Sequence, residues 1–155
     1  MSKTIDLPPP HLCHVGTLRK AARRLSMLYD AVVAPCGLKM PQVGILMAVG
    51  RAGAPTMGEL AATMVLDRSA LTENLKPLVR KGLLEVRVCA HDKRIRRVAL
   101  TEAGAEKLAE CLPRWAEAQL RFEAVFGEEE ATHLRADLGQ IASPDFVGAF
   151  DRPAG

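Results

Sequence analysis

The sequence predicts a mainly α-helical fold with one small β-hairpin, and two observations carry this prediction. Apolar residues recur at steps of three and four through most of the chain, which is the spacing of amphipathic helices. Between residues 84 and 100 the spacing changes to alternation, which is typical of half-buried strands. Hydrophobic residues make up 48% of the 155 residues, which is enough for one buried core without a disulfide or a metal.

A long helix is expected over residues 12–33, because one apolar stripe runs through this segment at helical spacing. Pro35 and Gly37 end it. Pro41 suits the first turn of a second helix, which ends in the segment 50–53. The residues of the stripe are Leu12, Val15, Leu18, Ala22, Leu25, Leu28 and Val32.

Two further helices, separated by a tight turn, are expected next. Thr56 and Glu59 have the spacing of a capping box at the start of the third helix. Asp67 suits the N-cap of a fourth helix over residues 68–81, and Gly82 follows its end. Pro77 removes one backbone hydrogen bond from this helix and is expected to bend it. The side chains expected to face the core are Leu71, Leu75, Leu78 and Val79.

The alternating segment predicts two antiparallel strands joined by an exposed tip. Leu84, Val86 and Val88 are expected to face the core. Residues 95–100 form the second strand, and the polar residues 90–94 form the tip. The hairpin therefore directly follows a pair of helices.

Two helices are expected in the last third of the chain. Thr101 caps the first, which reaches about Val125 with a kink at Pro113. Gly127 breaks it, and the last helix runs from the acidic residues 128–130 to about residue 142. Residues 143–155 are expected to form a tail, and residues 1–11 a flexible arm. The apolar residues expected to be buried are Leu108, Leu112, Trp115, Leu120, Leu134, Leu138 and Ile141.

The charge is unevenly distributed. The net charge is +3, but residues 101–155 hold five basic against eleven acidic residues, so residues 1–100 carry +9. The segment 80–97 alone carries +5 over eighteen residues. Such a concentration is either a solvated basic face or the binding surface for a polyanion.

Several classes of protein are not indicated. The sequence has no nucleophile elbow, no phosphate-binding glycine loop and no metal-spaced histidine pair, so we predict neither an enzyme nor a bound metal or cofactor. His11, Cys13 and His14 are close in sequence but make a poor preformed metal site. The four cysteines lack zinc-site spacing and are expected to be reduced. Without an apolar signal segment or membrane span, the chain is expected to be cytoplasmic, with no membrane partner.

Two short helices followed by a basic hairpin are the element order of a winged helix-turn-helix. Four segments resemble the MarR (multiple antibiotic resistance regulator) family over residues 12–142. They are Gly-Glu-Leu-Ala at 58–61, Leu-Asp-Arg-Ser-Ala-Leu-Thr at 66–72, Leu-Val-Arg-Lys-Gly-Leu-Leu at 78–84, and Asp92 and Arg94 with Val-Ala-Leu-Thr at 98–101 and Ala-Gly at 103–104. The resemblance implies a winged helix-turn-helix at about 41–100, with dimerisation helices at about 12–33 and 102–142.

The resemblance also implies a function. Such a protein is a sequence-specific regulator that binds double-stranded DNA. It is usually a homodimeric repressor on an inverted-repeat operator, and a small organic effector, often an aromatic anion, releases it. A winged-helix module that binds only other proteins is the alternative, which the strongly basic hairpin argues against.

The resemblance assigns DNA contacts residue by residue. Arg94 corresponds to the arginine that enters the minor groove, and Asp92 to the acid that orients it. Glu73 departs from the family, which often has a basic or polar residue there, so Glu73 either reads a base or faces away. The remaining candidate DNA contacts are Arg68, Ser69, Thr72, Asn74 and Lys76 in the fourth helix and Arg87, Arg96 and Arg97 in the hairpin.

Two kinds of effector site are compatible with the resemblance. One branch of the family senses organic hydroperoxides through a cysteine near the start of the first helix, held by a tyrosine. Cys13 and Tyr29 are the matching residues here, although Cys13 falls two positions too early, about 200° around a helix. The alternative is a non-covalent pocket, with candidates Thr17, Arg23, Met47 and Trp115.

Overall fold

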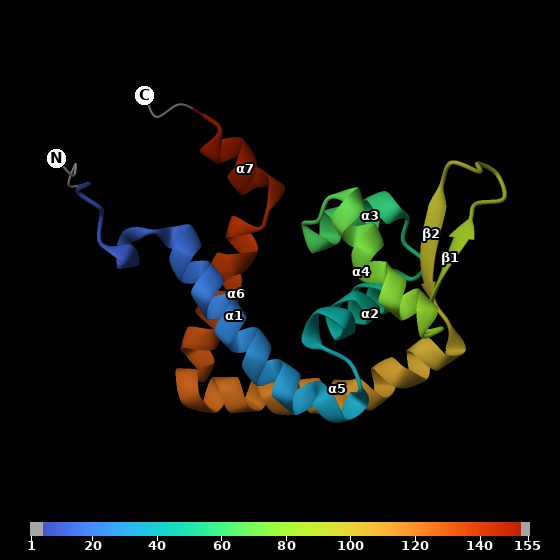
Figure 1. Cartoon of the computed structure of the whole chain (residues 1–155), viewed down its shortest axis with the longest axis horizontal. Coiled ribbons are helices and arrows are strands. Elements are labelled where there is room, and N and C mark those ends of the chain that lie inside the picture. The colour runs from blue at the N-terminus through green and yellow to red at the C-terminus, as the bar shows by residue number, and fades with distance from the viewer. Residues whose placement is uncertain (1–4, 153–155) are drawn as a thin grey trace.

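The computed structural model describes residues 5–152, and helices dominate it (Figure 1). One side holds α1 (His14–Val33), α6 (Glu128–Ile141) and α7 (Pro144–Phe150). The other side holds α2 (Met40–Ala52), α3 (Met57–Met64), α4 (Arg68–Arg80) and the hairpin of β1 (Leu84–Val88) and β2 (Arg96–Leu100). The long helix α5 (Glu102–Phe126) joins the two sides, since it begins at the base of the hairpin and ends at α6. The mainly helical fold with one hairpin is confirmed.

The first helix begins two residues later than expected. Pro10–Leu12 form a short 3₁₀ turn, so the last residues of the predicted arm are ordered into this turn. The Sγ of Cys13 then accepts a hydrogen bond from the Gly16 amide at 3.3 Å and caps α1. A second 3₁₀ turn (Ala34–Cys36) and Gly37, with φ 71°, redirect the chain into α2.

The core lies between α2, α3, α4, the base of the hairpin and α5. Leu71, Leu75 and Leu78 face it, which confirms three of the four inward positions predicted for α4. Each fully buried leucine stabilises the fold by roughly 1.5–3 kcal/mol relative to an exposed one. The largest fully buried side chains are Leu46, Leu60, Leu71, Leu78, Leu84, Val33, Val43, Val49, Val98 and Cys111.

The outer half of the hairpin projects beyond this core. The antiparallel register pairs Leu84 with Leu100 at the base and Val88 with Arg96 near the tip. Leu84 is buried as predicted, but Val86 and Val88 are 41% and 55% exposed, so the prediction that they pack against the core is wrong. The reason is that α4 packs only against the base of the hairpin, and Val79 of α4 is exposed as well.

The junction between hairpin and α5 is held by Thr101. Its hydroxyl donates to the Gly82 carbonyl at 2.5 Å and accepts from the Gly104 amide at 3.0 Å. A Cβ at Gly104 would lie 1.9 Å from the Leu83 carbonyl oxygen, so this contact requires glycine. The predicted cap at Thr101 and the predicted glycine after α4, Gly82 with φ 68°, are both confirmed.

The C-terminal part differs from the prediction in two ways. Residues 144–150 form α7, where a tail was expected, because Ser143 caps the first turn and Pro144 fits within it. Several apolar residues of α5 and α6 expected to be buried are exposed in the single chain, and Leu120 is 67% exposed. Most of the α1 stripe is exposed too, so these helices present apolar surface without a cover.

Candidate nucleic-acid interface

Helix caps and a tight turn position the helix pair α3–α4. The Thr56 hydroxyl accepts from the Glu59 amide at 3.1 Å, and the Glu59 carboxylate accepts from the Thr56 amide at 2.7 Å, which completes the predicted capping box. Val65 ends α3 with φ 51°, a left-handed conformation that is unfavourable for a β-branched residue. Asp67 then caps α4 by accepting from the Ala70 amide at 2.7 Å. The turn therefore presents the first residues of α4 at the surface.

The exposed side of α4 carries most of the predicted contact residues. Arg68, Thr72 and Lys76 follow one another at steps of four, which places them along one side of the helix. The Thr72 hydroxyl donates to the Arg68 carbonyl at 2.7 Å, which leaves its oxygen lone pairs as acceptors. Ser69 is also exposed on the adjoining face, whereas Asn74 lies on the opposite flank of the helix.

Glu73 lies on the exposed side of α4. It occupies the same stripe as Ser69 and Lys76, at steps of four and three. Its carboxylate pairs with the Lys76 ammonium at 2.5 Å. Glu73 is therefore exposed beside candidate DNA-contact residues, with its carboxylate neutralised by Lys76.

Arg94 and Asp92 lie at the tip of the wing, which is the β1–β2 hairpin of residues 84–100. The Asp92 carboxylate accepts from the Arg94 backbone amide at 2.9 Å and lies 3.5 Å from the Arg94 Nε. The Arg94 side chain is 94% exposed. The acid thus holds the backbone of the tip and leaves the guanidinium free to project.

Helix α4 and the wing, the two candidate DNA-binding elements, both line one hollow of about 460 Å³. Arg68 and Thr72 line it from α4, and Arg94 and Arg96 line it from the wing. Residues separated by more than twenty positions in the sequence therefore share one exposed, strongly basic concavity. The remaining lining residues are Thr56, Met57, Gly58 and Ile95.

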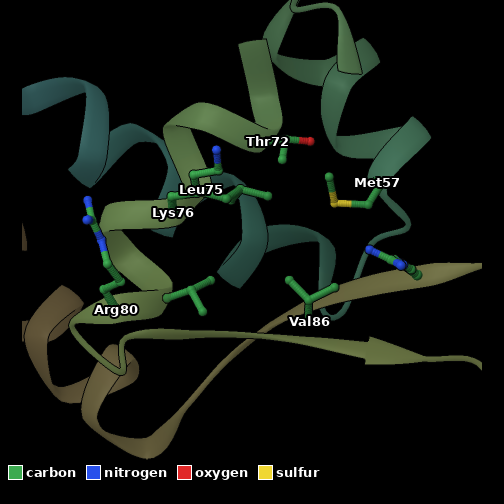
Figure 2. A pocket seen from close by; sticks show the side chains of 8 residues that line it. Met57, Thr72, Leu75, Lys76, Arg80 and Val86 are labelled. Atoms are coloured by element: carbon green, nitrogen blue, oxygen red, sulfur yellow. The ribbon is translucent and has the colours of Figure 1, made fainter. Parts of the chain in front are cut away.

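A second hollow of about 350 Å³ lies between the rest of α4 and the strands (Figure 2). Leu75 of α4, Met57 of α3 and Val86 of β1 surround it with apolar side chains, while Lys76 and Arg80 lie along its α4 side. Sequence reasoning missed this hollow because it expected Val86 to close against the core.

Two of the predicted hairpin contacts have partners within the protein. Arg87 forms an ion pair with Glu85, and Arg97 donates from Nη1 to the Ala54 carbonyl at 2.9 Å. Arg96, by contrast, is exposed, and its side chain forms no hydrogen bond or ion pair among residues 5–152. The basic hairpin thus contains arginines of two kinds, those held by the protein and those facing outward.

The predicted effector residues are spread over three helices. Thr17 and Arg23 are exposed on α1, while Met47 and Trp115 are half-buried on α2 and α5, and none of the four lines the basic hollow or the hollow of Figure 2. A hollow of about 360 Å³ does lie between α1 and α5, and it is almost wholly apolar. It is lined by Leu25, Leu28, Tyr29, Val32, Ala118, Arg121, Phe122, Val125 and Phe126.

The predicted redox pair is separated within one chain. Cys13 is exposed at the start of α1, and Tyr29 lies sixteen residues further on, which is about 24 Å along a helix. The Tyr29 hydroxyl donates to Gln119 of α5 at 2.5 Å. Burial raises the pKa of Tyr29, and the nearby charge of Glu123 raises it further, so this hydroxyl stays protonated and donates.

Residues 5–152 contain neither a metal-binding cluster nor a single helix suited to cross a membrane. This part of the chain contains no group of three or more His, Cys, Asp or Glu side chains placed to hold a metal ion. None of its helices is by itself long and apolar enough to cross a membrane. The pair His14–Cys36 and Met40–Ala52, which is bent by 74°, reaches the required length and apolar composition only when the two helices are taken together.

A helix-turn-helix whose second helix shares an exposed basic face with a hairpin defines the class of winged-helix DNA-binding proteins. The sequence model of the MarR family matches residues 37–95. The structure of the transcriptional regulator MosR of Mycobacterium tuberculosis, in complex with DNA, is similar with a TM-score of 0.79 and 32% identity, covering 90% of this chain and 99% of MosR. This chain therefore belongs to the MarR family of transcriptional regulators.

Two further similarities agree with this assignment. The HTH-type transcriptional regulator PecS of Dickeya dadantii is 27% identical over 139 residues, which cover 88% of this chain and 84% of PecS. The transcriptional repressor CouR, bound to a 23-mer DNA duplex, shares the fold with a TM-score of 0.78 at 22% identity, covering 91% of this chain and all of CouR. Members of the family are regulators of transcription, not enzymes.

Proposed function

We propose that this chain is a sequence-specific, homodimeric repressor that binds an inverted-repeat operator in double-stranded DNA. One observation carries the proposal: Arg68 and Thr72 of α4 and Arg94 and Arg96 of the wing line a single hollow. A helix inserted in the major groove and a hairpin tip in the adjacent minor groove require this arrangement. MosR and CouR, whose structures contain DNA, support it as relatives of the same fold.

The roles of the contact residues follow from their positions. Arg68, at the start of α4, is suited to read a guanine, and Thr72 and Ser69 to accept or donate at base edges. Lys76, Asn74 and Arg96 are suited to phosphates, which fix position without reading sequence. Arg94 is suited to a narrow minor groove, where the negative potential is strongest.

The dimer is proposed because of the uncovered apolar surface on α1, α5 and α6. The apolar hollow between α1 and α5 and the exposed residues Leu28, Leu120 and Val125 are surfaces that a single chain leaves in water. A second copy related by a two-fold axis covers the same patch on both chains. The two-fold axis then explains an operator with two inverted half-sites.

Release from DNA is proposed to follow binding of a small organic effector, an aromatic anion being the favoured class. Arg23 supplies a cation for such an anion, and Thr17, Met47 and Trp115 remain the candidate lining residues. The second candidate mechanism is oxidation of Cys13 by an organic hydroperoxide, which its exposure at the start of α1 supports.

The experiment is a selection of duplexes from a random DNA library by the purified protein, followed by titration at several salt concentrations. We expect an enriched inverted repeat, and an affinity for it that falls steeply with salt because phosphate contacts release counterions. Enrichment of no sequence would overturn the proposal and favour a module for protein contacts. Treatment of the complex with cumene hydroperoxide separates the two release mechanisms, because only the Cys13 mechanism predicts release that Cys13→Ser abolishes.

A further inference from the structure

Arg97, in the middle of β2, is tied to the segment that precedes α3. Its Nη1 donates to the Ala54 carbonyl oxygen at 2.9 Å, and its backbone forms an isolated antiparallel bridge with Thr56. The next amide, that of Val98, donates to the Pro55 carbonyl at 2.9 Å. The wing is therefore joined to the helix-turn-helix both through the backbone of β2 and through one guanidinium group.

The far end of this connection is the cap of α3. Hydrogen bonds from the backbone and side chain of Thr56 lower the pKa of Glu59, and the positive charge of Arg97 lowers it further. Arg97 and Glu59 also line a hollow of about 260 Å³ beside α2 and α3, together with Leu60. The guanidinium of Arg97 thus lies over the start of α3, where it has both a carbonyl acceptor and a nearby carboxylate.

The strand register shows why this arrangement keeps Arg97 away from its cross-strand neighbour. Arg87 and Arg97 are directly opposite one another in the hairpin, and like charges in this position destabilise a sheet. Each has a separate partner, since Arg87 pairs with Glu85 and Arg97 bonds to Ala54. Arg96, the adjacent residue in β2, points to the other face of the strand and lines the basic hollow with Arg94.

We propose that Arg97 is a positioning residue that fixes the wing against α3, so that Arg94 and Arg68 reach DNA at the same time. This inference rests on the DNA binding proposed above, and it separates Arg97 from the phosphate contacts with which the sequence pattern groups it. A guanidinium that bonds a backbone carbonyl holds geometry, whereas Arg96 is free to contact a phosphate.

The first test needs no DNA. Hydrogen exchange of the Val98 and Cys89 amides is measured in the wild type, in Arg97→Ala and in the matched control Arg96→Ala. We expect at least tenfold faster exchange at Val98 in Arg97→Ala, less than a twofold change in Arg96→Ala, and unchanged exchange at Leu75 in the core. Exchange at Val98 equal to that of the wild type would overturn the proposal. If the alanine variant loses its helical circular dichroism, Arg97→Lys replaces it, because a lysine lacks the guanidinium fork and faster exchange is still expected.

The second test is a double-mutant cycle with Arg94→Ala on the duplex selected by the wild-type protein. Arg97→Ala is expected to weaken binding about tenfold in the wild-type background and less than threefold in the Arg94→Ala background, since a misplaced wing matters only while its tip has a contact to make. Equal factors in both backgrounds would show an independent phosphate contact and overturn the proposal. A wild-type protein that selects no duplex contradicts the proposed function, and the exchange measurement still decides whether Arg97 holds the wing.

Discussion

At the scale of single residues, the first prediction concerns Arg94 at the tip of the wing. Arg94→Ala is expected to weaken binding to the selected duplex by about 1–3 kcal/mol, because an arginine in a narrow minor groove gains from its concentrated negative potential. Stability should not change, since the Arg94 side chain is 94% exposed and its ion pair with Asp92 lies at the surface. Titration by fluorescence anisotropy at fixed salt measures the first effect, and thermal unfolding the second.

Two neighbouring variants make this test specific. Lys93→Ala removes an equally basic residue from the same tip and is expected to change affinity by less than half as much. Arg68→Ala should weaken binding and also relax base preference, because a major-groove arginine typically reads a guanine. Binding of Arg94→Ala as tight as that of the wild type would mean that the wing does not enter the groove.

A second prediction concerns the backbone strain at Val65, in the turn between α3 and α4. Its φ of 51° is costly for a β-branched residue, and its side chain is 67% exposed, so little packing opposes a replacement. Val65→Asn is expected to raise the free energy of unfolding by about 1 kcal/mol, because asparagine tolerates the left-handed region. Urea unfolding at one fixed protein concentration measures this. Val88→Asn, at an exposed strand position, is the control and should give no gain.

The cysteines differ in their surroundings, and their reactivity should differ accordingly. Burial, and after it contact with the Cys36 thiol, raises the pKa of the Cys111 thiol to about 12, so Cys111 stays protonated at neutral pH. Backbone amides of His91 and Asp92 lower the pKa of Cys89. With an aromatic disulfide reagent at pH 8, Cys13 and Cys89 are expected to react quickly, and Cys36 and Cys111 only on unfolding. Four equally fast thiols would contradict this.

The raised pKa of Cys111 also predicts how stability depends on pH. The folded state holds the proton that the unfolded state loses above its ordinary pKa of about 9. The contribution of the protonated Cys111 thiol to the free energy of unfolding is therefore complete below pH 9 and is lost as the pH rises towards 12. Denaturant midpoints measured across this range should fall in the wild type and fall less in Cys111→Ala.

At the scale of elements, local signals predicted most of the fold. The caps at Thr56, Asp67 and Thr101 and the glycine at residue 82 mark helix ends by direct bonding to the backbone, and all four are confirmed. What failed depends on tertiary packing. Alternation in β1 predicts two faces but not how far α4 covers one of them, so the exposure of Val86 was not predicted.

In the candidate DNA-binding site, too, local sequence signals predict some positions, and tertiary packing decides the others. Exposure of Arg68 and Thr72 follows from helical spacing, and the sequence predicts it. The bond from Arg97 to Ala54 joins residues 43 positions apart, and no periodicity indicates it. A basic residue in a strand has the same sequence pattern whether it faces solvent or bonds a carbonyl, so the two kinds of hairpin arginine are distinguished only by the fold.

A further prediction concerns Gly104, at the junction between the wing and α5. Gly104→Ala would place a Cβ against the Leu83 carbonyl, and the backbone cannot rotate away as a side chain can. We expect a loss of about 1–3 kcal/mol, the cost of overpacking. Gly44→Ala is the matched control, because nothing lies within 4 Å of its added Cβ in the interior of α2, and it should be neutral or stabilising. Equal unfolding midpoints for the two variants would contradict the close contact.

At the scale of the whole molecule, the basic wing and the acidic start of α6 lie in different regions. The densest basic segment, residues 80–97, covers the end of α4 and the wing, while α6 begins with Glu128, Glu129 and Glu130 at the far end of α5. An acidic end distant from the wing repels DNA and favours approach by the basic face. The long helix α5 links the proposed DNA-binding and dimerisation regions, so a shift at one end can change the spacing of two wings.

The last prediction concerns association. Light scattering at micromolar concentration is expected to give twice the chain mass of 16.8 kDa, because the apolar hollow between α1 and α5 needs a cover. Phe122→Glu places a charge in that hollow, so it should give a monomer with helical circular dichroism retained. Its affinity for the selected duplex should fall more than tenfold, since one chain reaches only one half-site. Val88→Glu puts the same charge at an exposed position on the wing and should remain a dimer. A wild-type monomer that binds the duplex fully would contradict the dimer, and a dimeric Phe122→Glu would place its interface elsewhere on the chain.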